Sequence, residues 1–168
     1  MQLLSDGDEN IREKAVFAYI RRVYRRFLLP ENKMFPFVYN DAGRLQSKRS
    51  KQKNDCTVRA LALSAEVEYD VAYDLLKDRG RKASKGHFFP KQRSDDIALG
   101  YKFIWKSFPA VKGQKRMNPE RFAEEFPEGV YICRTAKHVY MVQDGVVHDI
   151  FKNRPDRCIY GCWKVVKI

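Results

Sequence analysis

The stretch KHVYMVQDGVVHDIF, residues 137–151, decides how this sequence folds. It contains two short runs rich in β-branched and aromatic residues, and Asp144-Gly145 separates them. An Asp-Gly pair between two such runs is a strong signal for a two-residue hairpin turn. We therefore predict two antiparallel strands, over residues 138–143 and 146–151.

The turn also predicts which side chains of the hairpin share a face. A two-residue turn places Met141 opposite His148, and Tyr140 opposite Asp149. Because side chains alternate between faces along a strand, His138, Tyr140 and Asp149 then point to one face, and His148 and Met141 to the other. His138 and Asp149 become diagonal neighbours within hydrogen-bonding reach. A shift of the register by one residue would remove this arrangement.

Working outward, the segment NDCTVRALALS, residues 54–64, predicts a helix that begins next to a cysteine. Asn54 or Asp55 is a suitable N-cap, and the helix should run to about residue 67. The free N–H groups and dipole of a helix start favour a negative charge, and Arg59 adds to the effect, so the Cys56 thiol should ionise readily. The alternative is a small buried residue in the first turn of a core helix.

Cys56, His138 and Asp149 together predict a nucleophilic site. A thiolate attacks, a histidine moves the proton, and a carboxylate orients the imidazole ring. The structural alternative is a packed His138 and an Asp149 that ends its strand. The coincidence of a helix-start cysteine with a histidine and a carboxylate on one sheet face favours the catalytic interpretation.

Four segments carry a resemblance to known families: YNDAGR (39–44), NDCTVRALALS (54–64), KHVYMVQDGVVHDIF (137–151) and RCIYGCW (157–163). They are similar to an uncharacterised family of small bacterial and bacteriophage proteins with a predicted papain-like fold. The layout resembles papain-like cysteine peptidases, and NDCTVRAL is similar to the cysteine motif of OTU deubiquitinases. The resemblance implies that Cys56 is the nucleophile, His138 the base and Asp149 the orienting group.

The sequence departs from the papain-like pattern at the oxyanion site. That pattern commonly places a glutamine about six residues before the cysteine, where this chain has Ser50. We expect Gln52 or Asn54 to supply the donor instead, together with the Cys56 backbone N–H. We also expect Arg59 and Tyr140 to contact the substrate.

The remaining sequence places helices before strands, which predicts an α+β fold. Residues 1–34 should form a basic helical extension, which either packs on the domain or binds a phosphate backbone or a membrane surface. Residues 35–168 should form the papain-like domain, with the nucleophile-bearing helix on a C-terminal antiparallel sheet. Its other expected elements are an extended segment at 35–39, a loop at 44–53, helices at 69–79, 94–99 and 119–126, and strands at 101–105, 130–133 and 158–168.

The charge balance of 33 Lys and Arg against 21 Asp and Glu, a formal net charge of +12, favours contact with nucleic acid or an acidic partner. No apolar run is long enough to span a membrane. The four cysteines should be free thiols, and the spacing of Cys158 and Cys162 does not suit a metal site. We expect no cofactor, and a location in the cytoplasm of a bacterial host cell or in a virion.

Three functions follow from these patterns. The first is a cysteine hydrolase that cleaves an amide or isopeptide bond in a protein or peptide. The second is a catalytically silent papain-like binding protein, a virion component or host-directed inhibitor, that contacts nucleic acid or an acidic partner through its basic surface. The third is a peptidoglycan amidase, which the lack of an export signal and wall-binding repeats makes less favoured.

Overall fold

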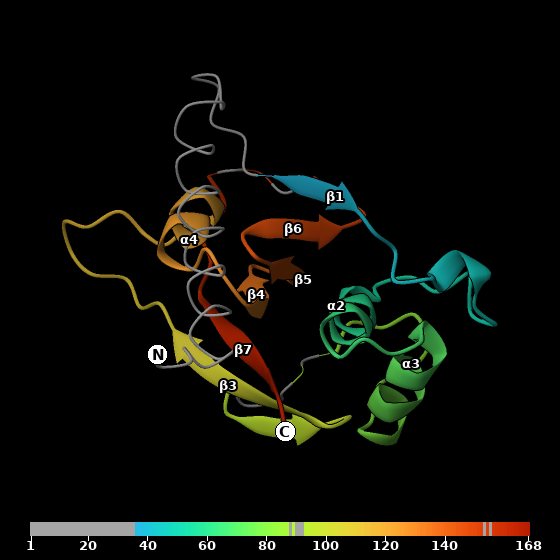
Figure 1. Cartoon of the computed structure of the whole chain (residues 1–168). Helices are drawn as coiled ribbons and strands as arrows, with labels where there is room; N and C mark the ends of the chain where they lie inside the picture. Colours follow the sequence, from blue (N-terminus) through green and yellow to red (C-terminus); the bar gives the residue numbers. More distant parts are fainter. Residues whose placement is uncertain (1–35, 88, 90–92, 153, 155) are drawn as a thin grey trace, which may run out of the picture. The chain divides into compact units, whose positions relative to one another are not determined.

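The computed structural model describes residues 36–168 with the exception of 88, 90–92, 153 and 155. The basic extension expected over residues 1–34 lies outside these described residues. The described part of the chain is an α+β domain built on one sheet (Figure 1). Its elements, in chain order, are β1 Phe37–Tyr39, the 3-10 helix η1 Arg44–Gln46, α2 Cys56–Ser64, α3 Tyr69–Asp78, β2 Asp96–Ala98, β3 Tyr101–Ser107, α4 Pro119–Glu125, β4 Val130–Thr135, β5 His138–Gln143, β6 Val146–Asp149 and β7 Gly161–Lys167.

The strands form a single sheet in the order β1-β6-β5-β4-β7-β3-β2. Neighbouring strands are antiparallel except for β1, which pairs with β6 in parallel. The pairing of β1 with β6 brings Tyr39 next to Asp149. The Asn40 N–H continues it by donating to the Asp149 carbonyl oxygen at 3.0 Å. The backbone carbonyl of Asp149, at the end of β6, is therefore held by the segment that follows β1.

The predicted hairpin and its register are confirmed. Met141 pairs with His148, as a two-residue turn requires. Both turn residues have positive φ, 48° at Asp144 and 71° at Gly145, which is the conformation of a type I′ turn. Strand β6 ends at Asp149, two residues before the expected end.

Two apolar clusters cover the two faces of the sheet, with α2 and α3 on one side and α4 on the other (Figure 1). The first cluster includes Leu61, Tyr69, Phe103, Val139 and Trp163. The second includes Phe122, Tyr131, Cys133, Tyr140 and Cys162. Members of both clusters alternate along β4 and β5, as the two-residue period of a strand requires.

Helix α3 follows its prediction in position, and its residue Val71 faces outward. The side chain of Val71 is 46% exposed. The helix begins at Tyr69, which is buried. The buried residues of α3 are therefore those at positions 69, 72, 73 and 76, which lie on one face of the helix. Position 71 lies on the opposite, solvent-exposed face.

The helix expected over residues 94–99 is wrong, because this segment is strand β2. It pairs antiparallel with the start of β3 and joins it through Leu99 and Gly100. These two residues have φ values of 55° and 77°, again a hairpin conformation. Gly100 is the second residue of this turn.

By contrast, α4 begins at residue 119, the first residue of the helix expected over 119–126. Its N-cap is Asn118, whose Oδ1 accepts from the Arg121 N–H at 2.9 Å.

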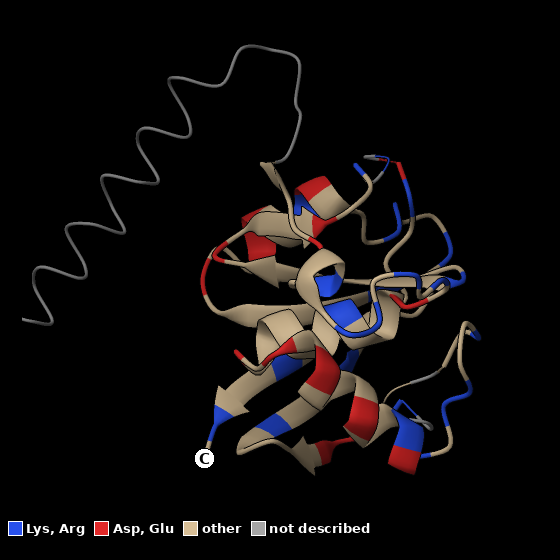
Figure 2. Ribbon diagram, turned by 90° about the vertical axis from the view of Figure 1, so that its right-hand side faces the viewer, with Lys and Arg blue, Asp and Glu red and all other residues tan. Residues whose placement is uncertain are grey.

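No helix among the described residues has both the length and the apolar content needed to cross a membrane. Lys and Arg are concentrated in loops that project from one side of the domain, the right-hand side of Figure 2. The charge excess of the sequence is thus distributed unevenly over the part of the chain that the structure describes.

Candidate active site

Cys56 is the first residue of α2 and contacts His138 of β5. Asp55 occupies the N-cap position, so the Cys56 backbone N–H belongs to the free first turn of the helix. Burial is the largest influence on the thiol and raises its pKa. A hydrogen bond with His138, the charge of His138, a backbone hydrogen bond at Val139 and the charge of Arg59 together lower that pKa below its ordinary value. The sulfur is therefore poised to ionise.

The pKa values of the Cys133 and Cys162 thiols shift upward, opposite to that of Cys56. Burial raises the pKa of Cys133 well above its ordinary value, and raises the pKa of Cys162 to about 12. Both lie in the apolar cluster beneath α4. Among Cys56, Cys133 and Cys162, only Cys56 has a lowered pKa, because only it faces a histidine.

His138 is hydrogen-bonded to Asp149, as the hairpin register predicts. The distance from His138 Nε2 to Asp149 Oδ2 is 2.5 Å. Because Nε2 is occupied by the carboxylate, Nδ1 is the ring nitrogen left to exchange a proton with the Cys56 sulfur. Burial lowers the pKa of His138, but the bonds and charges of Asp149 and Cys56 outweigh burial and raise it to about 9.

Asp149 is almost fully buried and is held through both oxygens. Oδ2 accepts from His138, while Oδ1 accepts from Arg59 Nη2 at 3.1 Å and from the Ile150 N–H at 2.8 Å. Burial raises its pKa, but the bond and charge of His138, the charge of Arg59 and the Ile150 bond lower the pKa below its usual value. The carboxylate thus stays ionised and fixed in orientation.

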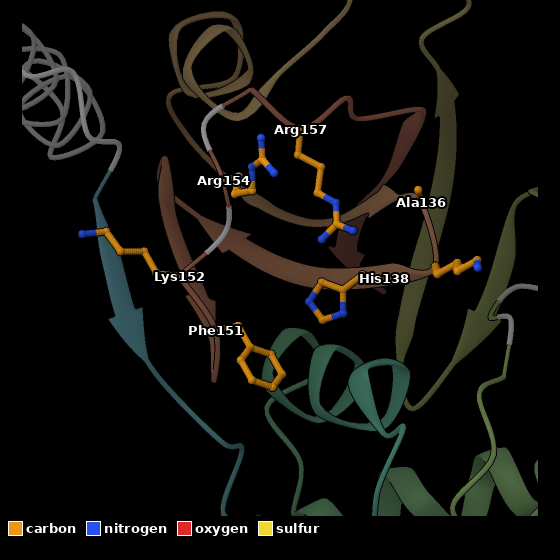
Figure 3. Close-up of a pocket in the computed structure, with 7 residues that line it drawn as sticks. Ala136, His138, Phe151, Lys152, Arg154 and Arg157 are labelled. Carbon is orange, nitrogen blue, oxygen red and sulfur yellow. The ribbon is translucent and has the colours of Figure 1, made fainter.

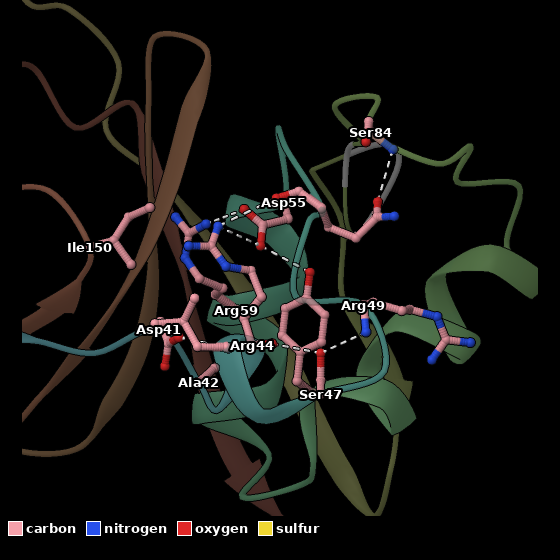
Figure 4. A network of polar contacts seen from close by, with 12 residues as sticks. Asp41, Ala42, Arg44, Ser47, Arg49, Asp55, Arg59, Ser84 and Ile150 are labelled. Atoms are coloured by element: carbon pink, nitrogen blue, oxygen red, sulfur yellow. Dashed lines mark hydrogen bonds and ion pairs between the residues drawn. The ribbon is translucent and has the colours of Figure 1, made fainter.

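Arg59 connects this carboxylate to a second one, Asp55, in the same helix. Its Nη1 pairs with Asp55 Oδ1 (Figure 4), while its Nη2 pairs with Asp149. Asp55 also accepts from the Tyr69 hydroxyl at 2.9 Å and from Arg44 Nη1 at 3.4 Å. A continuous line of polar contacts therefore leads from Arg44 through Asp55, Arg59 and Asp149 to the imidazole.

The expectation that Arg59 contacts substrate is corrected by this network. Its side chain is only 4% exposed, and its guanidinium is shared between two buried carboxylates. Arg59 therefore holds the two carboxylates and does not face the surface. The sequence carried a signal for it, because Asp55 and Arg59 are four residues apart at a helix start, the spacing of an intrahelical ion pair.

Tyr140 is also corrected, because it is only 1% exposed and cannot reach a substrate. Its ring lies 6.1 Å from the ring of His138, on the sheet face where the register predicts it. Its hydroxyl is buried without a hydrogen-bond partner among the described residues. Tyr140 therefore packs against the imidazole as part of the core.

The two candidate oxyanion residues both contact Ser84 in the loop after α3. Gln52 Oε1 accepts from the Ser84 N–H at 2.9 Å, and Asn54 Nδ2 donates to the Ser84 carbonyl at 3.1 Å. Asn54 thus commits one of its two amide N–H groups to the loop, whereas the contact of Gln52 involves only its oxygen. Gln52 therefore keeps both amide N–H groups outside this contact, and Asn54 keeps one.

Residues that sequence reasoning missed are Arg44, Asp55 as an ion-pair partner, and Tyr69. Asp55 was interpreted as a helix cap, yet its side chain makes no capping hydrogen bond. It is 2% exposed and committed to Arg44, Arg59 and Tyr69. A buried aspartate so close to a cysteine requires partners from other segments, and no local pattern identifies Tyr69 as one of them.

A cleft of about 290 Å³ opens beside His138. Its lining consists of Ala136, Lys137, His138, Phe151, Lys152, Arg154 and Arg157 (Figure 3). Figure 3 shows the Arg157 side chain extending toward the imidazole and the Phe151 ring on the other side of it. The imidazole is therefore reachable from this cleft.

Fold and site together describe an α+β domain in which a helix-start cysteine meets a histidine and a carboxylate from one hairpin. Comparison of the chain with protein-family models, with curated proteins and with solved structures finds no match. Among the described residues, no group of three or more His, Cys, Asp or Glu side chains is arranged to hold a metal ion.

Proposed function

We propose that this chain is a papain-like cysteine hydrolase that cleaves an amide or isopeptide bond. The observation that carries the proposal is the contact series from Cys56 through His138 to Asp149. The opposite pKa directions of Cys56 and His138 favour a thiolate–imidazolium pair, which is the activated form of a cysteine nucleophile.

The proposed reaction begins when the Cys56 sulfur bonds to the carbonyl carbon and the C=O π electrons move to oxygen. That oxyanion accepts hydrogen bonds from the Cys56 backbone N–H and the Gln52 amide. His138 then gives its Nδ1 proton to the leaving nitrogen as the C–N bond breaks, which yields a thioester and a free amine. Water attacks the thioester while His138 takes its proton, and the acid leaves with the thiolate restored.

The proposal is tested by the rate at which iodoacetamide alkylates each cysteine of the full-length protein at neutral pH, followed by peptide mass spectrometry. We expect Cys56 to react at least about tenfold faster than Cys133, Cys158 and Cys162, because only thiolate reacts. His138→Ala should abolish this preference.

His148→Ala is the matched control, because His148 belongs to the same hairpin but faces away from His138. It should leave the rate of Cys56 unchanged. Equal and slow labelling of all four cysteines would contradict a hydrolase and favour the catalytically silent binding protein.

A further inference from the structure

The cleft beside His138 has a lining whose charged residues other than His138 are all basic. Lys137, Lys152, Arg154 and Arg157 contribute to it, and no Asp or Glu is among its lining residues. Arg154 is paired with Asp156 at 2.8 Å, so part of its charge is compensated. Across the described residues, no carboxylate lies within ion-pair distance of Lys137, Lys152 or Arg157.

The cleft combines this charge with one apolar wall. The Phe151 side chain is 63% exposed and lies against the cleft. A ligand pocket usually encloses a few hundred to a thousand Å³, so about 290 Å³ suits one or two amino-acid residues better than a large ligand. An acidic side chain meets such a site with its carboxylate on the cations and its methylene groups on the phenyl ring.

We propose that this cleft is a subsite for an acidic side chain of a peptide substrate, close to the bond that is cleaved. The inference rests on the proposed hydrolase function and names its substrate class. The cleft is bounded by the imidazole itself, so a residue seated there lies near the reacting carbonyl. A polynucleotide is less suited, because it contacts a basic track along its backbone, and this cleft is a single recess.

The test is the binding of two fluorescein-labelled peptides to the full-length Cys56→Ala protein, measured by fluorescence anisotropy at physiological ionic strength. One peptide alternates Glu with Ala, and the other replaces each Glu by Gln. Since charge-assisted hydrogen bonds to exposed cations are of modest strength, we expect the Glu peptide to bind about tenfold more tightly.

The variant Lys152→Gln/Arg157→Gln should remove this preference. The control Lys102→Gln/Lys167→Gln makes the same change in net charge on β3 and β7, which β4 separates from β5 in the sheet, and it should keep the preference. Equal affinity for both peptides, or an equal loss in both double variants, would overturn the subsite.

A single-stranded oligonucleotide is the competing probe. If it displaces the Glu peptide and loses more affinity in the cleft variant than in the control, the cleft binds a polynucleotide and the proposal is wrong. The alkylation rate of Cys56 in the wild-type protein tests the hydrolase function separately from this binding experiment.

Discussion

At the scale of single residues, the site depends on the different hydrogen-bond partners of the two Asp149 carboxylate oxygens. One oxygen orients His138, and the other is neutralised by Arg59 and the Ile150 N–H. A buried carboxylate without such partners would take up a proton, and it would then no longer favour a protonated imidazole. Under the proposed function, Arg59 therefore keeps the Asp149 carboxylate charged and oriented toward His138.

The first residue-scale prediction concerns Asp149→Asn. The protonated His138 lowers the pKa of Cys56, and Asp149 favours that protonation. Removing the carboxylate charge should therefore move the pKa of Cys56 upward, toward its ordinary value of 9.0. The pH at which iodoacetamide alkylation reaches half its maximal rate should rise accordingly.

The matched control for this measurement is Asp74→Asn, an exposed aspartate of α3 that pairs with Arg49. Its pH profile should overlay that of the wild type. An unchanged profile in Asp149→Asn would mean that the carboxylate does not act through the imidazole.

At the scale of secondary-structure elements, close packing between strands sets narrow limits on substitution. Gly161 begins β7 opposite β3, and a Cβ atom there would lie 2.2 Å from a ring carbon of Trp105 and 2.6 Å from the Lys106 carbonyl oxygen. Relieving these contacts would require both the packed Trp105 ring and the β3 backbone to move. The absence of a side chain at position 161 is what lets β7 and β3 pair at this point.

We accordingly expect Gly161→Ala to lower the free energy of unfolding by about 1–3 kcal/mol, the usual cost of overpacking. Urea denaturation with a measured midpoint and slope checks this. Gly86→Ala is the control, because a Cβ there would meet no atom within 4 Å. It should stay within about 1 kcal/mol of the wild type. Equal stability of the two variants would contradict the packing argument.

The hairpin could be predicted because its signals are local. The Asp144-Gly145 turn and the alternation around it determine which side chains meet, and the contact of His138 with Asp149 follows from them. The start of α2 was likewise predicted from its neighbouring polar residues. The segment 94–99 was misassigned because a glycine after a short apolar run ends a helix or begins a hairpin turn equally well.

At the scale of the whole molecule, the bond between Arg59 and Asp149 and the burial of Tyr140 could not be predicted. Both depend on burial, which arises only when α2, β5 and β6 come together. The parallel pairing of β1 with β6 was also not expected, because it joins segments more than a hundred residues apart and no local pattern records it. Long-range packing thus decided which polar side chains are buried as partners of Asp149 and which remain exposed.

The pH dependence of stability is a property of the whole fold. His138 has a pKa of about 9 when folded and 6.5 as its ordinary value, so by itself it contributes stability below pH 6.5 that is lost as the pH rises through 9. Cys56, with a lowered pKa, contributes in the opposite sense. When the sulfur ionises and the imidazole is protonated, folding takes up no net proton, and stability changes little with pH in this interval.

We therefore expect Cys56→Ala to expose the contribution of His138. In this variant Asp149 still raises the pKa of the imidazole, so the unfolding free energy should decline with rising pH above 6.5. Urea denaturation across pH 6–9 should give a flatter curve for the wild type. The double variant Cys56→Ala/His138→Ala should be flat as well. A declining curve in that double variant would assign the effect to another group.

Helix α2 supplies both the sulfur and the guanidinium that holds the acidic partner of the imidazole. A displacement of this helix against the hairpin would separate both pairs in one movement, while the bond between His138 and Asp149, which lie in one hairpin, would remain. Under the proposed function, molecules displaced in this way would be inactive. The fraction of the protein whose Cys56 alkylates rapidly would then count the molecules in which helix and hairpin are docked.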